Sequence, residues 1–368
     1  MSKRIVIDAR IINSTTGRYV ERLLTHLEDI DKENEYIILV PTKDLGYWTP
    51  RNRNFTLREA NFKNYSFGEQ FGLAILLYRL KPDLVHFCMP QQPLLYFKKH
   101  VTTLHDLILL RTYNSDKNWL TFHLKQFIGR FVFWWVGLSS RFILTPSSFT
   151  RDDYLSFSHI NPNKVKMIYL AADTTVYKPK KAALPYKEFI MYVGQQSDYK
   201  NIRALIKAHQ KLIVTKPNLG LILVGGKNKL IQMNENWVKE KSYKNVYFTG
   251  FLSNEELAWT YKNCKAYVLP SLMEGFGLPG LEAMTQGAPV ISSNATCSPE
   301  IYGNAAHYFD PHDINDITKQ INIVLNNPAI QKKLIQNGFK QVKKYSWDKT
   351  AQQTHKTYTE ALANNKRL

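Results

Sequence analysis

The sequence predicts an α/β protein made of two doubly wound domains. With 368 residues the chain is longer than a single domain usually is, so two domains are expected. Short apolar runs alternate with amphipathic helical patterns, which is typical of parallel sheets covered by helices. A basic, proline-containing stretch at residues 177–186 interrupts this alternation, and the pattern then begins again. We therefore expect a first domain over residues 1–178, a second over residues 186–349, and a cleft between them.

Apolar runs in the first half mark the expected strands of the first sheet, at residues 5–8, 36–40, 83–87, 101–106, 142–145 and 165–170. Amphipathic patterns predict helices at residues 20–27 and 70–79. A further helix is expected to begin near Thr150, capped by Ser147 and Ser148. In a parallel sheet ligands bind beyond the carboxyl ends of the strands, so the residues just after these strands are candidates for a site.

Residues after the first and fourth strands meet this condition. Gly17 lies in the loop between the first strand and its helix, where doubly wound folds place phosphate, although it also suits an ordinary turn. His105 lies at the end of the fourth strand, which favours a contact with substrate over a structural role. Asp106 either orients His105 or caps the turn that follows.

The second half repeats the pattern, with expected strands at residues 189–194, 219–226, 246–252, 265–270 and 289–293. Helices are expected at residues 202–209 and 254–261. Gly194 ends the first of these strands, and Lys200 lies in the loop that follows it. A cation at this position could meet a phosphate group, or Lys200 could be an ordinary solvated lysine.

The stretch over residues 271–290 is the most informative part of the chain. Three glycines allow its backbone to turn and to approach a ligand closely: Gly275, Gly277 and Gly280. Pro279 suits the start of a short helix and Gly287 the position after its end, so we expect Glu274 before the helix and Glu282 in its first turn. Loop amides and a helix N-terminus form an anion site, and the two carboxylates beside it should face hydroxyl groups. A nucleotide sugar has this combination of phosphate and hydroxyl groups.

Charge and cysteine content limit the partners and the compartment. Lysine and arginine number 49 against 30 acidic residues, a net charge of +19 that favours nucleic acid, anionic lipid or an acidic metabolite. The charge is dispersed along the chain, so it does not choose among these partners. Cys88, Cys264 and Cys297 are too far apart for a disulfide framework or a zinc motif, which favours a reducing cytoplasm. We expect no secretory leader and no membrane span.

Residues 119–141 interleave aromatic side chains with cations. Lys125, Arg130 and Arg141 lie among tryptophans and phenylalanines, including Trp134. One interpretation is a helix on a membrane surface, with aromatic rings in the interface and cations at anionic headgroups. The other is a core helix packed on the sheet. The two interpretations are compatible if they concern different faces of one helix.

These residues together resemble the family 4 glycosyltransferases of the GT-B type. Glu274 and Glu282, separated by seven residues, match the glutamate pair that marks the family. Further matches occur in the same order along nearly the whole chain, at residues 7–10, 17–19, 82–86, 105–107, 192–194, 200–201, 248–252 and 345–347. The resemblance implies two Rossmann-like domains that face a central cleft, with a C-terminal helix over residues 350–368 completing the first, acceptor-side domain.

The resemblance assigns roles to residues of both halves. Glu274 would hold hydroxyl groups of the donor sugar, Lys200 would neutralise the departing diphosphate, and His105 would contact the sugar on the acceptor side. Glu282 would accept hydrogen bonds from the ribose. The other donor-binding positions that it implies are Gly17 at the diphosphate, Gly194 after its strand, Leu252 at the nucleobase, and the backbone of Gly275, Phe276, Gly277 and Leu278 at sugar hydroxyl and phosphate oxygens.

The family retains the anomeric configuration and needs no metal, because protein cations stabilise the leaving group. This sequence departs from the family in one place. Relatives often carry an arginine soon after the strand glycine, whereas this chain has Gln195 and Gln196. Glutamine donates hydrogen bonds without a charge, so stabilisation of the leaving group is weaker or comes from elsewhere, with Lys227 and Arg203 as candidates.

The resemblance therefore implies a metal-independent, retaining hexosyltransferase. GDP-mannose is the first expectation for the donor, because the sequence looks like bacterial mannosyltransferases of surface polysaccharide assembly. The acceptor would be a glycan or a lipid-linked glycan at the inner face of the membrane, and we expect no cofactor and no nucleic-acid partner. Two alternatives stay open: a nucleotide-sugar epimerase of the same architecture, and a non-catalytic scaffold, which the two glutamines favour.

Overall fold

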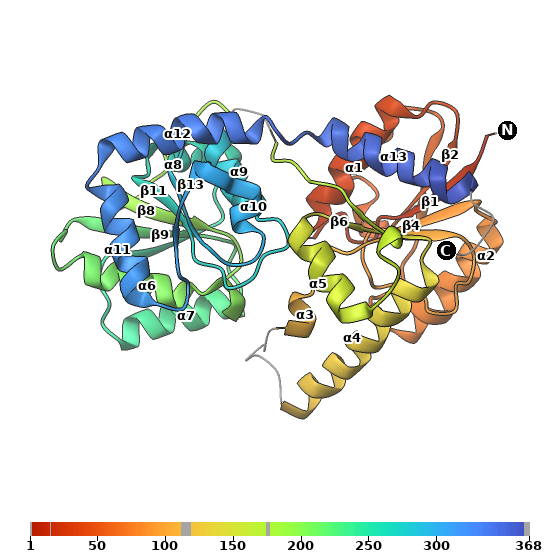
Figure 1. Ribbon diagram of the computed structural model, residues 1–368, viewed down its shortest axis with the longest axis horizontal. Helices are drawn as coiled ribbons and strands as arrows, with labels where there is room; N and C mark the ends of the chain where they lie inside the picture. The colour runs from red at the N-terminus through yellow and green to blue at the C-terminus, as the bar shows by residue number, and fades with distance from the viewer. Residues whose placement is uncertain (1, 15, 112–118, 174–176, 364–368) are drawn as a thin grey trace. The chain divides into compact units, whose positions relative to one another are not determined.

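The computed structural model describes residues 2–14, 16–111, 119–173 and 177–363, with the side chains of helix α4 described at His123 and from residue 126 onward. The described residues divide into two compact units. The first contains those of Met1–Arg111, Asn118–Leu170 and Ser346–Leu368, and the second those of Ala171–Tyr345. Each unit is built on one parallel sheet with helices on its faces (Figure 1).

The first sheet has the strand order β3-β2-β1-β4-β5-β6-β7 within the described residues. Its strands are β1 (Arg4–Asp8), β2 (Glu35–Val40), β3 (Phe55–Glu59), β4 (Leu84–Phe87), β5 (His100–Thr103), β6 (Phe142–Thr145) and β7 (Val165–Met167). The helices of this unit are α1 (Gly17–Ile30), α2 (Ala74–Leu80), α3 (Ile108–Arg111), α4 (Trp119–Ser139), α5 (Ser148–Ser158) and α13 (Trp347–Ala363). The order reverses between β1 and β4, which is where doubly wound sheets bind ligands.

Helix α13 packs on the first unit, beside α1 (Figure 1). Residues spaced three or four apart along it are buried, including Thr354, Tyr358 and Ala361, so one face of the helix meets the sheet. At its edge, His355 Nε2 lies 2.9 Å from Asp31 Oδ2. The last described helix of the chain is thus part of the hydrophobic core of the first unit.

The second sheet has the strand order β10-β9-β8-β11-β12-β13 within the described residues. Its strands are β8 (Glu188–Val193), β9 (Leu219–Val224), β10 (Val246–Gly250), β11 (Ala266–Leu269), β12 (Val290–Ser293) and β13 (Ala306–Phe309). The helices of this unit are α6 (Ile202–Leu212), α7 (Lys229–Glu240), α8 (Asn254–Asn263), α9 (Leu278–Thr285), α10 (Ser298–Tyr302), α11 (Ile314–Leu325) and α12 (Pro328–Val342). This order reverses between β8 and β11, so both sheets are doubly wound and the predicted fold class is confirmed.

Several elements were not indicated by the sequence pattern. Strand β3 was missed because it is the edge strand, and its Phe-Thr-Leu-Arg-Glu sequence is largely exposed. The helix expected at residues 70–79 is a π-helix, η2 (Gly68–Leu73), followed by α2. Helices α7, α11 and α12 and strand β13 were also missed. Strand β13 has only four residues, Ala-His-Tyr-Phe, which is too short for a clear pattern, whereas α7 and α11 are amphipathic and could have been found from their periodicity.

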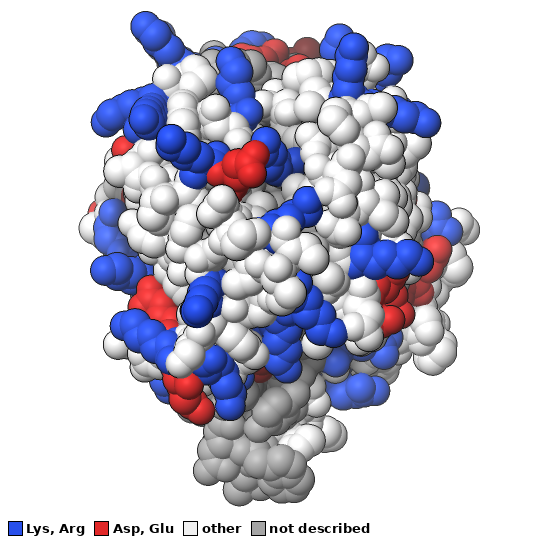
Figure 2. Space-filling model, turned by 90° about the vertical axis from the view of Figure 1, so that its left-hand side faces the viewer, with Lys and Arg blue, Asp and Glu red and all other residues white. Residues whose placement is uncertain are grey.

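The surface and the helices add two observations. Figure 2 shows lysine and arginine side chains dispersed among neutral residues over one face of the second unit, with no continuous basic strip on that face. None of the helices in the described part of the chain is long and apolar enough to cross a bilayer.

Candidate active site

The loop after β11 brings two predicted residues into direct contact. Glu274 lies between β11 and α9, and Lys200 ends the short turn η4 (Asp198–Lys200) after β8. Lys200 Nζ donates to Glu274 Oε1 at 2.6 Å, and Ser271 Oγ donates to the same oxygen at 2.6 Å. Glu274 is 7% exposed. Because β8 and β11 flank the reversal of the strand order, this buried ion pair lies where doubly wound folds bind ligands.

The ion pair fixes Lys200 as a cation. Burial by itself would lower the pKa of the Lys200 ammonium, but Glu274, with smaller contributions from Tyr192 and Tyr199, raises that pKa above the ordinary lysine value. Lys200 Nζ also lies 5.0 Å from the centroid of the Tyr199 ring, a distance typical of a cation–π contact. The site therefore offers a held positive charge next to a carboxylate that can accept hydrogen bonds from hydroxyl groups.

Two of the predicted glycines make room for a tyrosine. Gly277 caps α9 with a left-handed backbone, φ +80°, as the turn prediction requires. A Cβ atom at Gly277 would lie 2.2 Å from Tyr302 Oη, and one at Gly280 would lie 2.5 Å from atoms of the same ring. Tyr302 Oη donates to the Gly277 carbonyl oxygen. These glycines thus have a packing role in addition to the approach to a ligand that we predicted.

Glu282 lies further into helix α9 than predicted. The helix begins at Leu278, one residue before Pro279, so Glu282 is its fifth residue and lies in the second turn, whereas the first turn was predicted. The helix dipole therefore acts on Glu282 less than expected. Phe276 is buried against Tyr345, with ring centroids 5.6 Å apart, so a ligand can meet its backbone but not its side chain.

The remaining predicted positions of the second unit lie at strand ends. Gly194 follows β8 with φ +137°, in the loop that also holds Lys200. Leu252 follows β10 and is half-buried next to the exposed Phe251. Gly275 lies in the loop between Glu274 and α9. The structure thus places these positions at the carboxyl edge of one sheet, and their roles toward a donor stay predictions.

His105 lies after β5 in the first unit, with its ring held in one tautomer. Its Nε2 donates to the Cys88 carbonyl oxygen at 3.0 Å, and the Tyr19 ring packs edge-on against it at 4.9 Å between centroids. Burial lowers the pKa of His105 to about 4, although the bond to Cys88 acts in the opposite direction. The imidazole is therefore neutral at pH 7, and Nδ1 is an acceptor suited to a sugar hydroxyl group. Asp106 Oδ1 accepts from the Ile108 amide at 2.9 Å, which fits the capping alternative.

A buried hydrogen-bond chain next to His105 was not indicated by the sequence. His86 Nε2 lies 2.8 Å from Thr103 Oγ1, which lies 2.8 Å from Tyr19 Oη. On the other side of its ring, His86 Nδ1 lies 2.6 Å from Tyr358 Oη. Burial, with a smaller effect of His105, lowers the pKa of His86 to about 3. The chain therefore joins α13, β4, β5 and α1 through a neutral histidine.

Acid is expected to destabilise the protein through its buried histidines. The pKa of His86 is about 3, and burial lowers that of His209 to about 4, so both stay neutral in the folded state. Histidine in an unfolded chain takes up a proton near pH ~6.5, so the stability linked to these groups is complete above that pH and is lost as the pH falls toward their folded pKa values. Between pH 7 and pH 5 each should account for a loss of about 2 kcal/mol.

Urea unfolding at the two pH values checks this expectation. His86→Gln should lose about 2 kcal/mol less than the wild type between pH 7 and pH 5, because glutamine does not titrate. His312→Gln, at an exposed position, should lose as much unfolding free energy between pH 7 and pH 5 as the wild type does. An unchanged pH dependence in His86→Gln would contradict a neutral, buried His86.

Gly17 is the first residue of α1, and the local packing requires a glycine there. A Cβ atom at this position would lie 1.8 Å from the Ile12 carbonyl oxygen. The Gly17 amide donates to the Ser14 carbonyl oxygen at 3.0 Å. The loop from β1 to α1 thus closes tightly, which fits the turn role, and an approach to a diphosphate stays a prediction.

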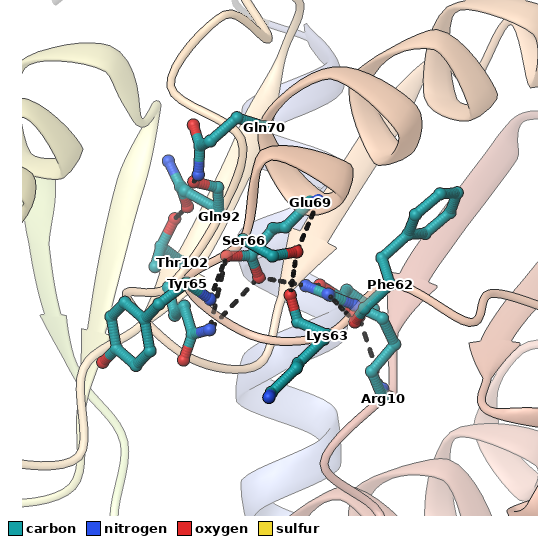
Figure 3. A network of polar contacts seen from close by, with 11 residues as sticks. Arg10, Phe62, Lys63, Tyr65, Ser66, Glu69, Gln70, Gln92 and Thr102 are labelled. Atoms are coloured by element: carbon teal, nitrogen blue, oxygen red, sulfur yellow. Dashed lines mark hydrogen bonds and ion pairs between the residues drawn. The ribbon is translucent and has the colours of Figure 1, made fainter.

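A buried ion network lies at the carboxyl end of β1 (Figure 3). Arg10 Nη2 lies 2.8 Å from Asp8 Oδ2 and 2.9 Å from Glu69 Oε1, and Nη1 donates to the Phe62 carbonyl oxygen at 3.0 Å. Burial alone would lower the pKa of Arg10, but Asp8 and Glu69 raise it. The sequence indicated Arg10 only as part of a motif, because its partner Glu69 lies on a separate element.

A groove of about 540 Å³ opens beside this network. Pro41, Ala60 and Phe62 contribute to a lining surface that is largely apolar. The polar residues that line the groove are Arg10, Thr42, Lys43, Asn61, Lys63 and Asn64. These residues follow the carboxyl ends of β1, β2 and β3. The polar groups can exchange hydrogen bonds with hydroxyl groups of a ligand, and the apolar surface can pack against its C–H groups.

Two protein-family models match the chain. The model described as Glycosyltransferase Family 4 matches residues 16–176, and the one described as Glycosyl transferases group 1 matches residues 173–341. The boundary between the two matches coincides with the boundary between the two sheets.

Two bacterial relatives share part of their length with the chain. It is 31% identical to O-antigen chain mannosyltransferase B of Escherichia coli over 235 residues, which are 60% of this chain and 61% of the relative. It is 30% identical to the serotype-specific mannosyltransferase WbdA of Escherichia coli over 281 residues, 73% of this chain and 34% of that relative. The matched region therefore spans less than two thirds of either relative.

A solved structure shares the fold of the chain. The crystal structure of Anabaena Alr3699/HepE in complex with UDP and glucose matches with a TM-score of 0.74 and 15% identity, covering 98% of this chain and 100% of that one. The two family models, the glutamate pair and the two doubly wound sheets agree with this fold. The chain belongs to the family 4 glycosyltransferases of the GT-B fold.

Proposed function

We propose that the protein is a retaining glycosyltransferase that moves a hexose from a nucleoside diphosphate sugar to a glycan or lipid-linked glycan, with GDP-mannose as the donor. The observation that carries this proposal is the buried pair of Glu274 and Lys200 at the reversal of the second sheet. The two relatives are named as mannosyltransferases, and the HepE structure contains UDP and glucose, which supports a nucleotide sugar as donor. We propose no metal ion or other cofactor, because Lys200 supplies the positive charge.

The donor would bind across the loop and the start of α9. Negative charge develops on the diphosphate as the sugar–phosphate bond breaks, and Lys200 together with the amides of residues 275–278 would stabilise it. Glu274 would hold sugar hydroxyl groups, Glu282 the ribose, and the backbone at Leu252 the nucleobase. The departing phosphate would take the proton of the acceptor hydroxyl group. That hydroxyl group attacks from the same face of the sugar, so the anomeric configuration is retained.

The first unit would supply the acceptor side. His105 presents a neutral imidazole whose Nδ1 can accept a hydrogen bond from a hydroxyl group. The groove beside Arg10 combines the amides of Asn61 and Asn64 and the cations of Lys43 and Lys63 with apolar surface from Pro41, Ala60 and Phe62. This lining supports a glycan as the acceptor class, with or without an acidic substituent.

We also propose that helix α4 contacts an anionic membrane surface. Its exposed apolar side chains recur every three or four residues and so share one face: Phe127, Phe131, Trp134 and Leu138. Phe133 and Val136 are buried on the other face, which agrees with the core interpretation for that face. Arg141 was expected among the membrane-facing cations, but it follows the helix and is buried. Arg130 is exposed and the helix contains no Asp or Glu, which suits anionic headgroups. Sequence residues 119–122, 124 and 125, including Lys125, lie outside the described side chains.

Substitution of the exposed apolar side chains of α4 should weaken the binding of the protein to vesicles. The double substitution Phe131→Glu with Trp134→Glu is expected to reduce binding to vesicles of phosphatidylglycerol by about tenfold or more, because two apolar side chains no longer enter the interface. Arg130→Glu should weaken binding chiefly at low salt. Val214→Glu, an equally drastic change at an exposed position of the second unit, should have no effect in flotation assays. Unchanged binding of the double variant would refute the membrane contact.

The glycosyl transfer itself is tested by following both halves of a labelled donor. Purified protein is incubated with GDP- and UDP-sugars and a mannose-terminated glycan, and the nucleotide and hexose products are separated. Release of nucleoside diphosphate together with labelled glycan supports the proposal. An epimerase would convert the sugar without releasing the nucleotide, and a scaffold would release none, so either result would replace the proposed function.

A further inference from the structure

The loop after β8 carries a buried glutamine whose side-chain nitrogen lacks a partner. Gln196 is 3% exposed, and its Oε1 accepts a hydrogen bond from Asn234 Nδ2 of α7 at 3.0 Å. Within the described part of the chain, nothing accepts a hydrogen bond from Gln196 Nε2. Buried amide N–H groups are usually hydrogen-bonded in folded proteins, so this donor is available to an acceptor from outside the chain.

An arginine fixes the direction of the hydrogen bonds around Gln196. Arg203 Nε of α6 donates to Asn234 Oδ1 at 3.0 Å. Arginine can only donate, so the oxygen of Asn234 faces Arg203 and its nitrogen faces Gln196. That nitrogen in turn takes the oxygen of Gln196, which leaves the N–H groups of Gln196 for another acceptor. The bonds run in one direction away from a cation, and hydrogen bonds in such a row polarise one another.

The position of Gln196 indicates what that acceptor is. Gln196 lies in the loop over residues 194–201, beyond the carboxyl end of β8, and Lys200 belongs to the same loop. This is the edge at the strand-order reversal, where a doubly wound sheet binds phosphate groups. A polarised N–H group and a lysine ammonium in one loop are both suited to phosphate oxygens.

We propose that Gln196 Nε2 donates a hydrogen bond to a phosphate oxygen of a nucleoside diphosphate, with Asn234 and Arg203 as positioning residues that aim and polarise it. The inference rests on the proposed function, since its ligand is the diphosphate of the donor. Nε2 is buried, so a phosphate oxygen can reach it only if the loop over residues 194–201 shifts, and the proposal includes that shift. Gln196 itself stays neutral, and the cation of Arg203 on α6 polarises its amide through two hydrogen bonds.

Isothermal titration with GDP, UDP and inorganic pyrophosphate tests the role of Gln196. Gln196→Met keeps a side chain of similar length and removes the donor. It should weaken the binding of pyrophosphate, and of whichever nucleoside diphosphate binds the wild type, by about tenfold. Guanosine and uridine lack the phosphates and should bind both proteins alike. Equal affinity of Gln196→Met and wild type for the diphosphates would overturn the inference.

Two matched variants test the positioning role of Arg203. Arg203 Cζ and Lys207 Nζ lie 5.1 and 6.0 Å from the centroid of the same Trp237 ring, and both side chains are on exposed positions of α6. Arg203→Met should weaken pyrophosphate binding about threefold, because the row of hydrogen bonds loses its cation. Lys207→Met removes the same charge outside the row and should have no effect. Equal losses in the two variants would indicate a general charge effect and refute the positioning role.

The outcomes separate this inference from the proposed function. Pyrophosphate binding that depends on Gln196, with no binding of any nucleotide sugar, would uphold the phosphate site and refute the glycosyltransferase proposal. Nucleotide-sugar binding that is equal in wild type and Gln196→Met would uphold the donor site and refute the role of Gln196. A wild type that binds neither pyrophosphate nor a nucleoside diphosphate would refute both.

Discussion

Replacing Glu274 with glutamine is expected to lower the rate of glycosyl transfer by about two to three orders of magnitude. Glu274 Oε1 accepts hydrogen bonds from both Lys200 and Ser271. The side-chain oxygen of glutamine can accept the same two bonds, but the neutral amide holds sugar hydroxyl groups less strongly than a carboxylate does. The same substitution releases Lys200 from its ion pair. The affinity for GDP or UDP should therefore stay the same or rise while transfer falls.

This opposite movement of binding and turnover distinguishes a catalytic Glu274 from a structural one. A loop acid that only held the backbone in place would lose binding and turnover together. Glu240→Gln, an acid exposed at 72% of its side chain in the same unit, serves as the control and should keep both parameters. Because the Glu274→Gln substitution leaves the Lys200 charge without its buried partner, a fall in stability of about 3 kcal/mol is expected, and assays belong well below the melting temperature. Turnover within tenfold of wild type would contradict a catalytic Glu274.

Replacing Lys200 with methionine is expected to weaken nucleoside diphosphate binding by about 10- to 100-fold and to lower transfer by a further factor of similar size. The ammonium is held 2.6 Å from Glu274 and kept protonated, so it is the preorganised charge that meets the departing diphosphate. Lys262→Met, at an exposed position, is the matched control. If the Lys200→Met variant bound GDP and UDP with the affinity of the wild type, the assignment of Lys200 to the diphosphate site would be wrong.

The two substitutions should also be strongly non-additive. Glu274 and Lys200 act as one unit, so the double variant Glu274→Gln with Lys200→Met should transfer little more slowly than the worse single variant. Since the pKa of Lys200 is raised, the stabilising effect of the pair is present at neutral pH. It is lost only as the pH climbs above the ordinary lysine value of about 10.4 toward the raised one.

Much of the fold follows from local patterns in the sequence. Buried strands such as β9 are continuous apolar runs, and Gly277 marks a turn that needs a left-handed backbone, so both can be predicted without neighbours. Strand β3 could not be predicted in this way, because an edge strand buries little and its alternation is weak. The packing of α13 on the first unit was implied by the family resemblance and not by any periodicity of the helix itself.

In the candidate site, too, some features follow from local sequence patterns and others depend on contacts between separate elements. The rule that ligands bind at strand ends placed Glu274 and Lys200 on one edge, although they are 74 residues apart. Their direct ion pair could not be predicted, because it depends on how two loops approach each other. The hydrogen-bond partners of His86 and Gln196 were missed for a similar reason: a buried polar residue is defined by neighbours from other elements.

Calorimetric titration of the wild type and Lys200→Met with a panel of GDP- and UDP-sugars measures donor binding at the Glu274–Lys200 pair most directly. We predict that the wild type binds one of these nucleotide sugars, GDP-mannose first among them, and that Lys200→Met binds it at least about tenfold more weakly. A wild type that binds none of the nucleotide sugars, or a Lys200→Met variant that binds the same donor with equal affinity, would contradict the assignment of this ion pair as the donor site.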